Sequence, residues 1–126
     1  MSCGPSVTDA GEVQLVPYAP MPALVCFSTC SDPASADRIA TALVEERLAA
    51  CVNVLPGARS TYRWQGRIQH DDEVLLMIKT TTDHLDVLRE RLPQLHPYEL
   101  PELIAVEAAG GLPAYLDWIA TETRAA

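Results

Sequence analysis

The chain is poor in basic residues, and this scarcity limits the partners that it can bind. Nine lysines and arginines stand against 17 aspartates and glutamates, which gives a formal net charge of −8. Such a charge repels phosphate backbones, and no basic cluster offsets it locally. The composition therefore predicts that neither nucleic acid nor an anionic membrane surface is a partner.

Long hydrophobic runs and a secretory signal are also missing. The longest apolar runs, such as residues 74–78, have the length of a strand and are too short to span a membrane. No basic start followed by an apolar stretch opens the chain, so we predict a cytoplasmic protein with reduced thiols. The cysteines fit neither a zinc finger nor a C-x-x-C redox motif, and they are Cys3, Cys26, Cys30 and Cys51.

Catalytic signatures are absent as well. The sequence contains no G-x-S-x-G, no P-loop, no G-x-G-x-x-G and no convincing pair of nucleophile and base. Its 126 residues suffice for one hydrophobic core but not for two. We therefore expect a single domain that is not an enzyme.

What the sequence does contain is a strand followed by an amphipathic helix. Residues 23–29 form a continuous apolar run, which is typical of a strand buried on both faces. Ser31, Asp32 and Pro33 then provide a helix cap and a proline at the first helical position. Residues 1–20 are interrupted by glycine and proline and are predicted to form a flexible extension, so the domain covers residues 21–126.

A long β-hairpin is predicted next. Residues 51–64 have strand character, interrupted by Pro56-Gly57, which should bend or bulge the strand. Gln65-Gly66 suits a two-residue turn, and the return strand covers residues 67–80 with a break near Asp71-Asp72. This hairpin is longer than an ordinary strand pair, and its tip would be an aggregation-prone edge unless another subunit paired with it.

A second helix, a fourth strand and a short C-terminal helix complete the domain. The second helix begins near Thr82 and should end or kink about Pro93, the strand covers residues 103–108, and the last helix opens at Pro113. This order predicts an α+β, ferredoxin-like βαββαβ fold, with an antiparallel sheet and both main helices on one face. The other face of so small a domain needs a cover, which a second copy of the subunit would supply.

His96 is the strongest candidate for a metal ligand. It lies with Glu99 and Glu102 in a loop stiffened by two prolines, and imidazole with carboxylates suits Cu(II) or Zn(II). The favoured alternative is a structural turn, because no further histidine stands at a ligand spacing. Cys26 and Cys30 allow the same two interpretations, and a pair of small buried apolar side chains is favoured over a metal or redox pair.

Glu73 raises a related question, because a carboxylate within an apolar strand needs a partner. Arg59, Arg63 and Lys79 are candidates for an ion pair between subunits, and service as a general base or a ligand is the other interpretation. The aromatic side chains that would either stack a ligand or pack at an interface are Tyr62, Trp64, Tyr115 and Trp118. Tyr98 is a further candidate for an interface or cleft residue.

Several ordered motifs resemble the CutA family of divalent-cation tolerance proteins. The resemblance covers about residues 23–119, and several blocks at compatible spacing are far more specific than any one of them. In order, the blocks are LAACVNVLPG at 48–57, S-x-Y-x-W-x-G at 60–66, Glu73, IKT at 78–80, HPYE-x-PE at 96–102 and YL-x-W at 115–118.

The resemblance implies a ferredoxin-like subunit assembled as a compact homotrimer, similar to that of the PII signalling proteins, with the long hairpins pairing between subunits. It also implies a role in tolerance to divalent metals, copper especially, with metal binding in some members. The copper ligands proposed for the family fall here at Ser28, Leu95 and His96.

Our leading hypothesis is a homotrimer that acts in the response to divalent cations by binding a metal ion or a small effector. Three alternatives stay open. They are a PII-like signalling trimer with a small organic ligand in its intersubunit clefts, a small enzyme that uses Glu73 or Glu107 with Tyr98, and a scaffold without a ligand.

Overall fold

The computed structural model describes residues 6–7, 13–14 and 22–125 of the chain. Most of the predicted N-terminal extension, residues 1–20, therefore lies outside the described residues, and its separation from a domain at 21–126 stays a prediction. The helices and strands are β1 (Ser6–Val7), β2 (Val13–Gln14), β3 (Ala23–Cys30), α1 (Pro33–Glu45), β4 (Cys51–Trp64), β5 (Arg67–Thr81), the 3₁₀ turn η2 (Thr82–His84), α2 (Leu85–Leu95), β6 (Ile104–Glu107) and α3 (Pro113–Glu122).

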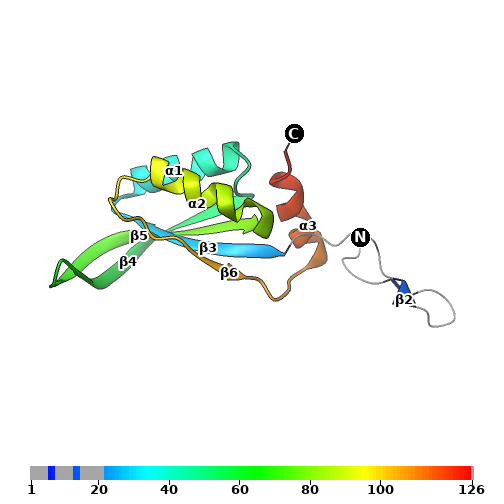
Figure 1. The fold of residues 1–126 in the computed structure, drawn as a ribbon, viewed down its shortest axis with the longest axis horizontal. Helices are drawn as coiled ribbons and strands as arrows, with labels where there is room; N and C mark the ends of the chain where they lie inside the picture. Colours follow the sequence, from blue (N-terminus) through cyan, green and yellow to red (C-terminus); the bar gives the residue numbers. More distant parts are fainter. Residues whose placement is uncertain (1–5, 8–12, 15–21, 126) are drawn as a thin grey trace.

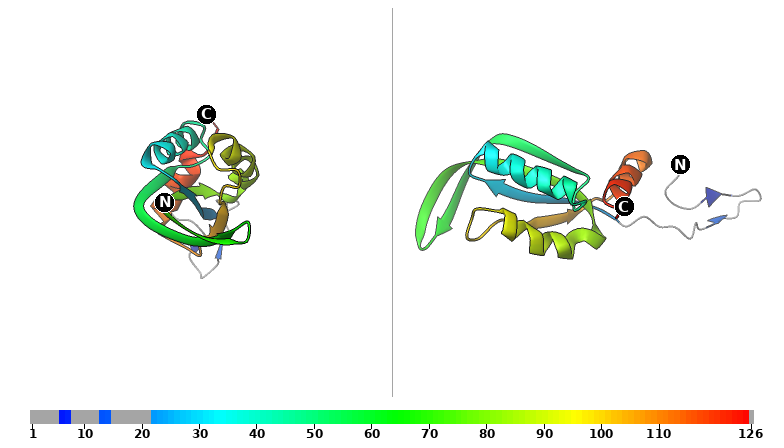
Figure 2. Two further views of the ribbon diagram at one scale, coloured as in Figure 1. Left: turned by 90° about the vertical axis from the view of Figure 1, so that its left-hand side faces the viewer. Right: turned by 90° about the horizontal axis from the view of Figure 1, so that it is seen from above.

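A four-stranded antiparallel sheet in the order β4-β5-β3-β6 forms the centre of the molecule. Helices α1 and α2 lie side by side over one face of this sheet, and α3 lies at the end opposite the hairpin tip (Figures 1 and 2). This arrangement confirms the predicted α+β, ferredoxin-like βαββαβ fold with its short C-terminal helix. Strands β1 and β2 pair with each other as a separate antiparallel ladder.

Local sequence signals explain where α1 begins. The Asp32 carboxylate accepts a hydrogen bond from the backbone N–H of Ser35 at 2.8 Å, and Pro33 occupies the first helical position. That backbone hydrogen bond stabilises the charged carboxylate and so lowers the pKa of Asp32 below its ordinary value. The cap and the proline predicted from the sequence are both present.

The core lies between the sheet and the two helices that cover it. Strand β3 buries Leu24, Cys26, Ser28 and Cys30 on the side of this core, while the alternating residues Val25, Phe27 and Thr29 are only half-buried. The prediction of a first strand buried on both faces is therefore wrong, because α1 and α2 cover one face of the sheet only. The fully buried side chains around this core include Ile39, Leu43, Leu76, Ile78, Leu88 and Leu92.

The β4–β5 hairpin is the longest element of the fold and extends beyond the rest of the sheet (Figure 1). Its register shifts between Leu55 and Ala58, at the bulge expected from Pro56-Gly57, where Gly57 has a φ of 91°. The break predicted near Asp71-Asp72 is wrong, because both residues continue the ladder opposite Ser60 and Arg59. The hairpin turns at Gln65-Gly66, as predicted.

The sequence predicts that the second helix ends or kinks about Pro93, and that no apolar run is long enough to cross a membrane. Helix α2 continues through Pro93 and ends at Leu95, where the backbone N–H of His96 still donates to the carbonyl oxygen of Leu92. Among the described residues, none of the helices has both the length and the apolar character that a membrane crossing requires.

Cys26 should make the stability of the fold sensitive to alkaline pH. Its thiol is fully buried, and this burial raises the pKa of Cys26 from 9.0 to about 11. Since the folded state keeps this proton to a higher pH than the unfolded state, the contribution to stability is complete below pH 9 and is lost as the pH rises through 11. We expect the free energy of unfolding in urea to fall less between these pH values in Cys26→Ala than in the parent protein.

The matched control for this experiment is Cys51→Ala. Cys51 is a free cysteine that is only half-buried at the start of β4, so its variant should follow the parent protein. An equal fall for Cys26→Ala and Cys51→Ala would contradict the prediction.

Candidate functional site

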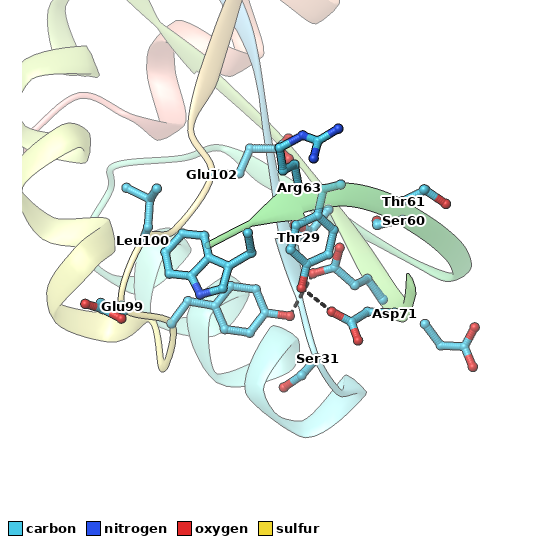
Figure 3. A pocket seen from close by; sticks show the side chains of 14 residues that line it. Thr29, Ser31, Ser60, Thr61, Arg63, Asp71, Glu99, Leu100 and Glu102 are labelled. Carbon is cyan, nitrogen blue, oxygen red and sulfur yellow. Dashed lines mark hydrogen bonds between the residues drawn. The ribbon is translucent and has the colours of Figure 1, made fainter. Parts of the chain in front are cut away.

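A cleft of about 870 Å³ lies between the outer half of the hairpin and the segment that connects α2 to β6. In Figure 3, Glu99 and Leu100 of the connecting segment stand on one side, and Ser60, Thr61 and Asp71 of the hairpin on the other. The remaining lining residues are Thr29, Ser31, Tyr62, Arg63, Trp64, Asp72, Glu73, Tyr98 and Glu102. Four of the five cleft or interface residues predicted from the sequence, all but Trp118, therefore line one cleft.

Glu73 and Tyr98 form the central contact of the cleft. The Tyr98 hydroxyl donates a hydrogen bond to Glu73 Oε2 at 2.7 Å, and Glu73 is only 8% exposed. Burial, followed by this bond to a carboxylate, raises the pKa of Tyr98 well above its ordinary value. Tyr98 therefore remains a neutral hydroxyl donor throughout the physiological pH range.

The partner of Glu73 in the structure differs from the cations expected for an ion pair. Arg59 lies 3.7 Å from Asp72, and Lys79 donates to the hydroxyl of Tyr115 instead. None of the ion pairs formed among the described residues includes Glu73. Among the described residues, the buried carboxylate is therefore paired with a neutral phenol and not with a cation.

A second tyrosine–carboxylate pair lies further along the hairpin. The Tyr62 hydroxyl donates to a carboxylate oxygen of Asp71, and this hydrogen bond raises the pKa of Tyr62. Asp71 and Asp72 were interpreted from the sequence only as a break in the strand, so their place in the cleft was missed. The missed signal is spacing, since both residues stand opposite Ser60 and Arg59 once the hairpin is folded about Gln65-Gly66.

His96 is buried at the edge of β3 and does not line the cleft. Its Nδ1 accepts a hydrogen bond from the backbone N–H of Tyr98 at 3.1 Å, so the ring proton is on Nε2. This N–H donates to the carbonyl oxygen of Thr29 at 2.7 Å, and Cys30 Sγ lies 3.5 Å from the same nitrogen. Both ring nitrogens are thus engaged in holding the connecting segment against the sheet.

The three residues predicted as metal ligands are therefore not gathered at one point. Glu99 and Glu102 line the cleft, whereas His96 faces β3. In the part of the chain that the structure describes, no three His, Cys, Asp or Glu side chains are grouped so that they would hold a metal ion. The carboxylates suit a divalent cation, but His96 has no free lone pair in this arrangement.

Trp118 belongs to a different surface. It packs against Tyr115 within α3 at a ring-centroid distance of 5.5 Å, and Lys79 Nζ lies 5.6 Å from the centre of the Tyr115 ring. Ile119 of the same helix packs against Ala23 and Ala50, which fixes α3 at the end of the sheet. Its aromatic pair therefore contributes nothing to the cleft.

Tyr98→Phe is expected to destabilise the fold, because it removes the hydroxyl that satisfies Glu73. A hydrogen bond to a charged group contributes about 1–3 kcal/mol, and we expect a loss of that size in urea unfolding. Tyr115→Phe is the matched control, because its hydroxyl receives only a long 3.3 Å bond from Lys79 at the surface. Equal losses for the two variants would contradict the assigned role of Tyr98.

Comparison with known proteins gives a consistent result. A family model described as CutA1 divalent ion tolerance protein matches residues 24–122. The chain is 55% identical over 85 residues to the divalent-cation tolerance protein CutA of Thermus thermophilus, covering 68% of this chain and 82% of that protein. It is 45% identical over 102 residues to the CutA of Pectobacterium atrosepticum, covering 81% of this chain and 93% of that protein.

Solved structures agree with these matches. The crystal structure of CutA from Xylella fastidiosa is 55% identical and superimposes with a TM-score of 0.79, covering 81% of this chain and 98% of that one. The crystal structure of CutA1 from Oryza sativa is 40% identical, with a TM-score of 0.81, and covers 85% of this chain and 98% of that one.

Proposed function

Because this chain belongs to the CutA1 divalent ion tolerance family, we propose that it acts in tolerance of divalent cations, copper among them, as a non-catalytic homotrimer that binds a metal ion or a small effector. The observation that carries this proposal is the charge of the cleft. Five carboxylates and a single guanidinium line it. Such a cleft attracts cations and repels anions.

The carboxylates that would hold a divalent cation are those at the cleft wall. Glu99 and Glu102 supply oxygen ligands, which divalent cations accept. His96 joins them only if its Nε2 exchanges the bond to Thr29 for a metal. In its observed orientation, His96 instead positions the segment that carries both glutamates.

A trimer is supported by the face of the sheet that none of the helices in the described part of the chain covers (Figure 1). Strand pairing places Phe27 opposite Met77 and Ile104 on that face, and Val25 opposite Val106. These side chains are half-buried or exposed. A contiguous apolar face of this kind is typical of a surface that binds another subunit.

Titration calorimetry with Cu(II) tests the metal part of the proposal. We expect saturable binding to the parent protein and weaker binding to the double variant Glu99→Gln/Glu102→Gln. Glu90→Gln, which removes a carboxylate from the exposed surface of α2, is the matched control and should bind as the parent does. Absent binding, or equal binding by the double variant and the control, would refute the assignment to this cleft.

Light scattering tests the trimer independently of any ligand. The expected mass in solution is three times the subunit mass of 13.7 kDa. A mass equal to that of one subunit would refute the assembly while leaving the metal titration to be judged by itself.

A small organic effector is the second candidate ligand. The aromatic residues Tyr62, Trp64 and Tyr98 line the same cleft as the carboxylates, and aromatic walls are typical of sites for organic molecules. A PII-like role as a signalling trimer would use such a ligand. A thermal shift with organic effectors but not with metal salts would favour this candidate over the first.

A further inference from the structure

The cleft combines four features that together restrict the chemistry of its ligand. The first is charge, because Asp71, Asp72, Glu73, Glu99 and Glu102 face a single Arg63. Asp72 is partly compensated by Arg59, at 3.7 Å. The remaining four carboxylates take part in none of the ion pairs formed among the described residues. Phosphate-bearing and carboxylate-bearing ligands are therefore repelled.

The second feature is the burial of Glu73. Glu73 is only 8% exposed, yet the one hydrogen bond that its carboxylate forms with other described residues comes from the neutral Tyr98 hydroxyl, which donates to Oε2. A buried carboxylate without a cationic partner is unfavourable, because the loss of hydration is not repaid by a nearby positive charge. A ligand that brings a positive charge to Glu73 would supply the missing partner.

The third feature is the exposure of aromatic and apolar surface around these carboxylates. In the single subunit, Tyr62 and Trp64 are 40% and 37% exposed, and Leu100 of the opposite wall is 70% exposed. A positive charge is attracted to the face of an aromatic ring, most strongly to tryptophan. The apolar surface around it favours a ligand with a hydrocarbon part.

The fourth feature is size. The cleft measures about 870 Å³, which lies within the range of sites that bury a small organic molecule. A bare metal ion would leave most of this volume, and all of its apolar lining, without a contact. The volume therefore matches an organic ligand better than a metal ion alone.

We propose that this cleft binds a small organic amine in its protonated form, with the ammonium group paired to Glu73 and the hydrocarbon part between Trp64 and the segment that carries Leu100. This inference rests on the small-effector part of the proposed function and names the class of that effector. The ammonium group donates to the carboxylate, while the Tyr98 hydroxyl keeps its own bond to Glu73 Oε2.

The test uses the fluorescence of Trp64 in the full-length Trp118→Phe protein, which removes the other tryptophan of the chain. The probe is 2-phenylethylamine, and its neutral analogue 2-phenylethanol and the anion 3-phenylpropionate serve as matched comparisons. We expect a saturable change in fluorescence with the amine and none with the alcohol or the anion over the same concentrations. Equal responses to the amine and the alcohol would overturn the role of charge.

Two variants distinguish binding of the amine at Glu73 from nonspecific binding to carboxylates elsewhere on the surface. Glu73→Gln keeps an acceptor for Tyr98 and removes the charge, so we expect the affinity for 2-phenylethylamine to fall by about tenfold or more. Glu90→Gln, on α2, should bind the amine as the parent does. If Glu73→Gln does not fold by circular dichroism, Asp71→Asn on the exposed hairpin replaces it, with a smaller expected loss. Unchanged affinity in the variant that folds would refute the proposal.

The Cu(II) titration distinguishes failure of this inference from failure of the metal proposal. Saturable Cu(II) binding without a response to 2-phenylethylamine overturns the amine site and leaves the metal site. A response to the amine without Cu(II) binding does the reverse. If the parent protein shows neither Cu(II) binding nor a response to 2-phenylethylamine, the assignment of the cleft as a binding site is refuted.

Discussion

Leu76→Ala is expected to lower the free energy of unfolding by about 3–5 kcal/mol, because truncating a fully buried leucine removes apolar contacts and leaves a cavity. Leu76 lies in β5, an inner strand of the sheet, and none of its surface is exposed. Its side chain points into the core beneath α1 and α2, among Ile39, Leu43 and Leu88. Few of these neighbours can move to fill the space, since each is itself packed on all sides.

Unfolding in guanidinium chloride, followed by circular dichroism at a fixed subunit concentration, measures this loss. The concentration is held constant because assembly adds to the apparent stability. Leu100→Ala is the control, as it removes the same atoms from a side chain that is 70% exposed, and it should change the stability by less than about 0.5 kcal/mol. Similar losses for the two variants would mean that Leu76 is not part of the core.

Met77→Glu is expected to dissociate the assembled protein. Met77 follows Leu76 directly, but the alternation of side chains along a strand places it on the opposite, uncovered face of the sheet. A carboxylate at this position would be buried without a partner in an assembled protein, whereas a separate subunit leaves it in contact with water. We expect the mass measured by light scattering to fall towards that of one subunit, with the helical content retained.

Val87→Glu provides the matched control for this experiment. It introduces the same charge at an apolar residue that is 51% exposed on α2, so the mass should not change. If Met77→Glu retains the mass of the parent protein, the uncovered face is not where the subunits meet. If both variants dissociate, the added charge rather than the chosen face would be responsible.

The parts of the fold that were predictable are those governed by local signals. The cap at Asp32, the turn at Gln65-Gly66 and the irregularity at Pro56-Gly57 each depend on residues within a few positions of one another. Their outcome does not require knowledge of the rest of the chain. The order of the elements then leaves few ways to close the sheet, so the fold class was predictable as well.

The contacts of the cleft were harder to predict because they join distant segments. Tyr98 and Glu73 are separated by 25 positions in the chain. Residues of a local motif lie much closer together than this. The sequence suggested arginine and lysine as partners for Glu73 on grounds of charge, and geometry gave a phenol instead. The family resemblance places the two residues in separate motif blocks and does not indicate that their side chains form a hydrogen bond.

His96 illustrates the same limit in another form. Its residue type and neighbours suggested a metal ligand, and that assignment stays a prediction. The direction of an imidazole ring depends on the donors and acceptors around it, and here these are the carbonyl oxygen of Thr29 and the backbone N–H of Tyr98. Both groups belong to the backbone, so the residue types in the sequence do not reveal them.

The length of the hairpin has a mechanical consequence for the cleft. Towards the hairpin tip, residues 67–73 of β5 pair with β4 and with no other described strand, so the two strands form a ribbon that curves away from the helices (Figure 2). Such ribbons twist more strongly than strands inside a sheet. This ribbon forms one wall of the cleft, and a segment that His96 anchors to β3 forms the other. The width of the cleft therefore depends on the curvature of the ribbon between the bulge at Gly57 and its tip, and not on the packing of the core.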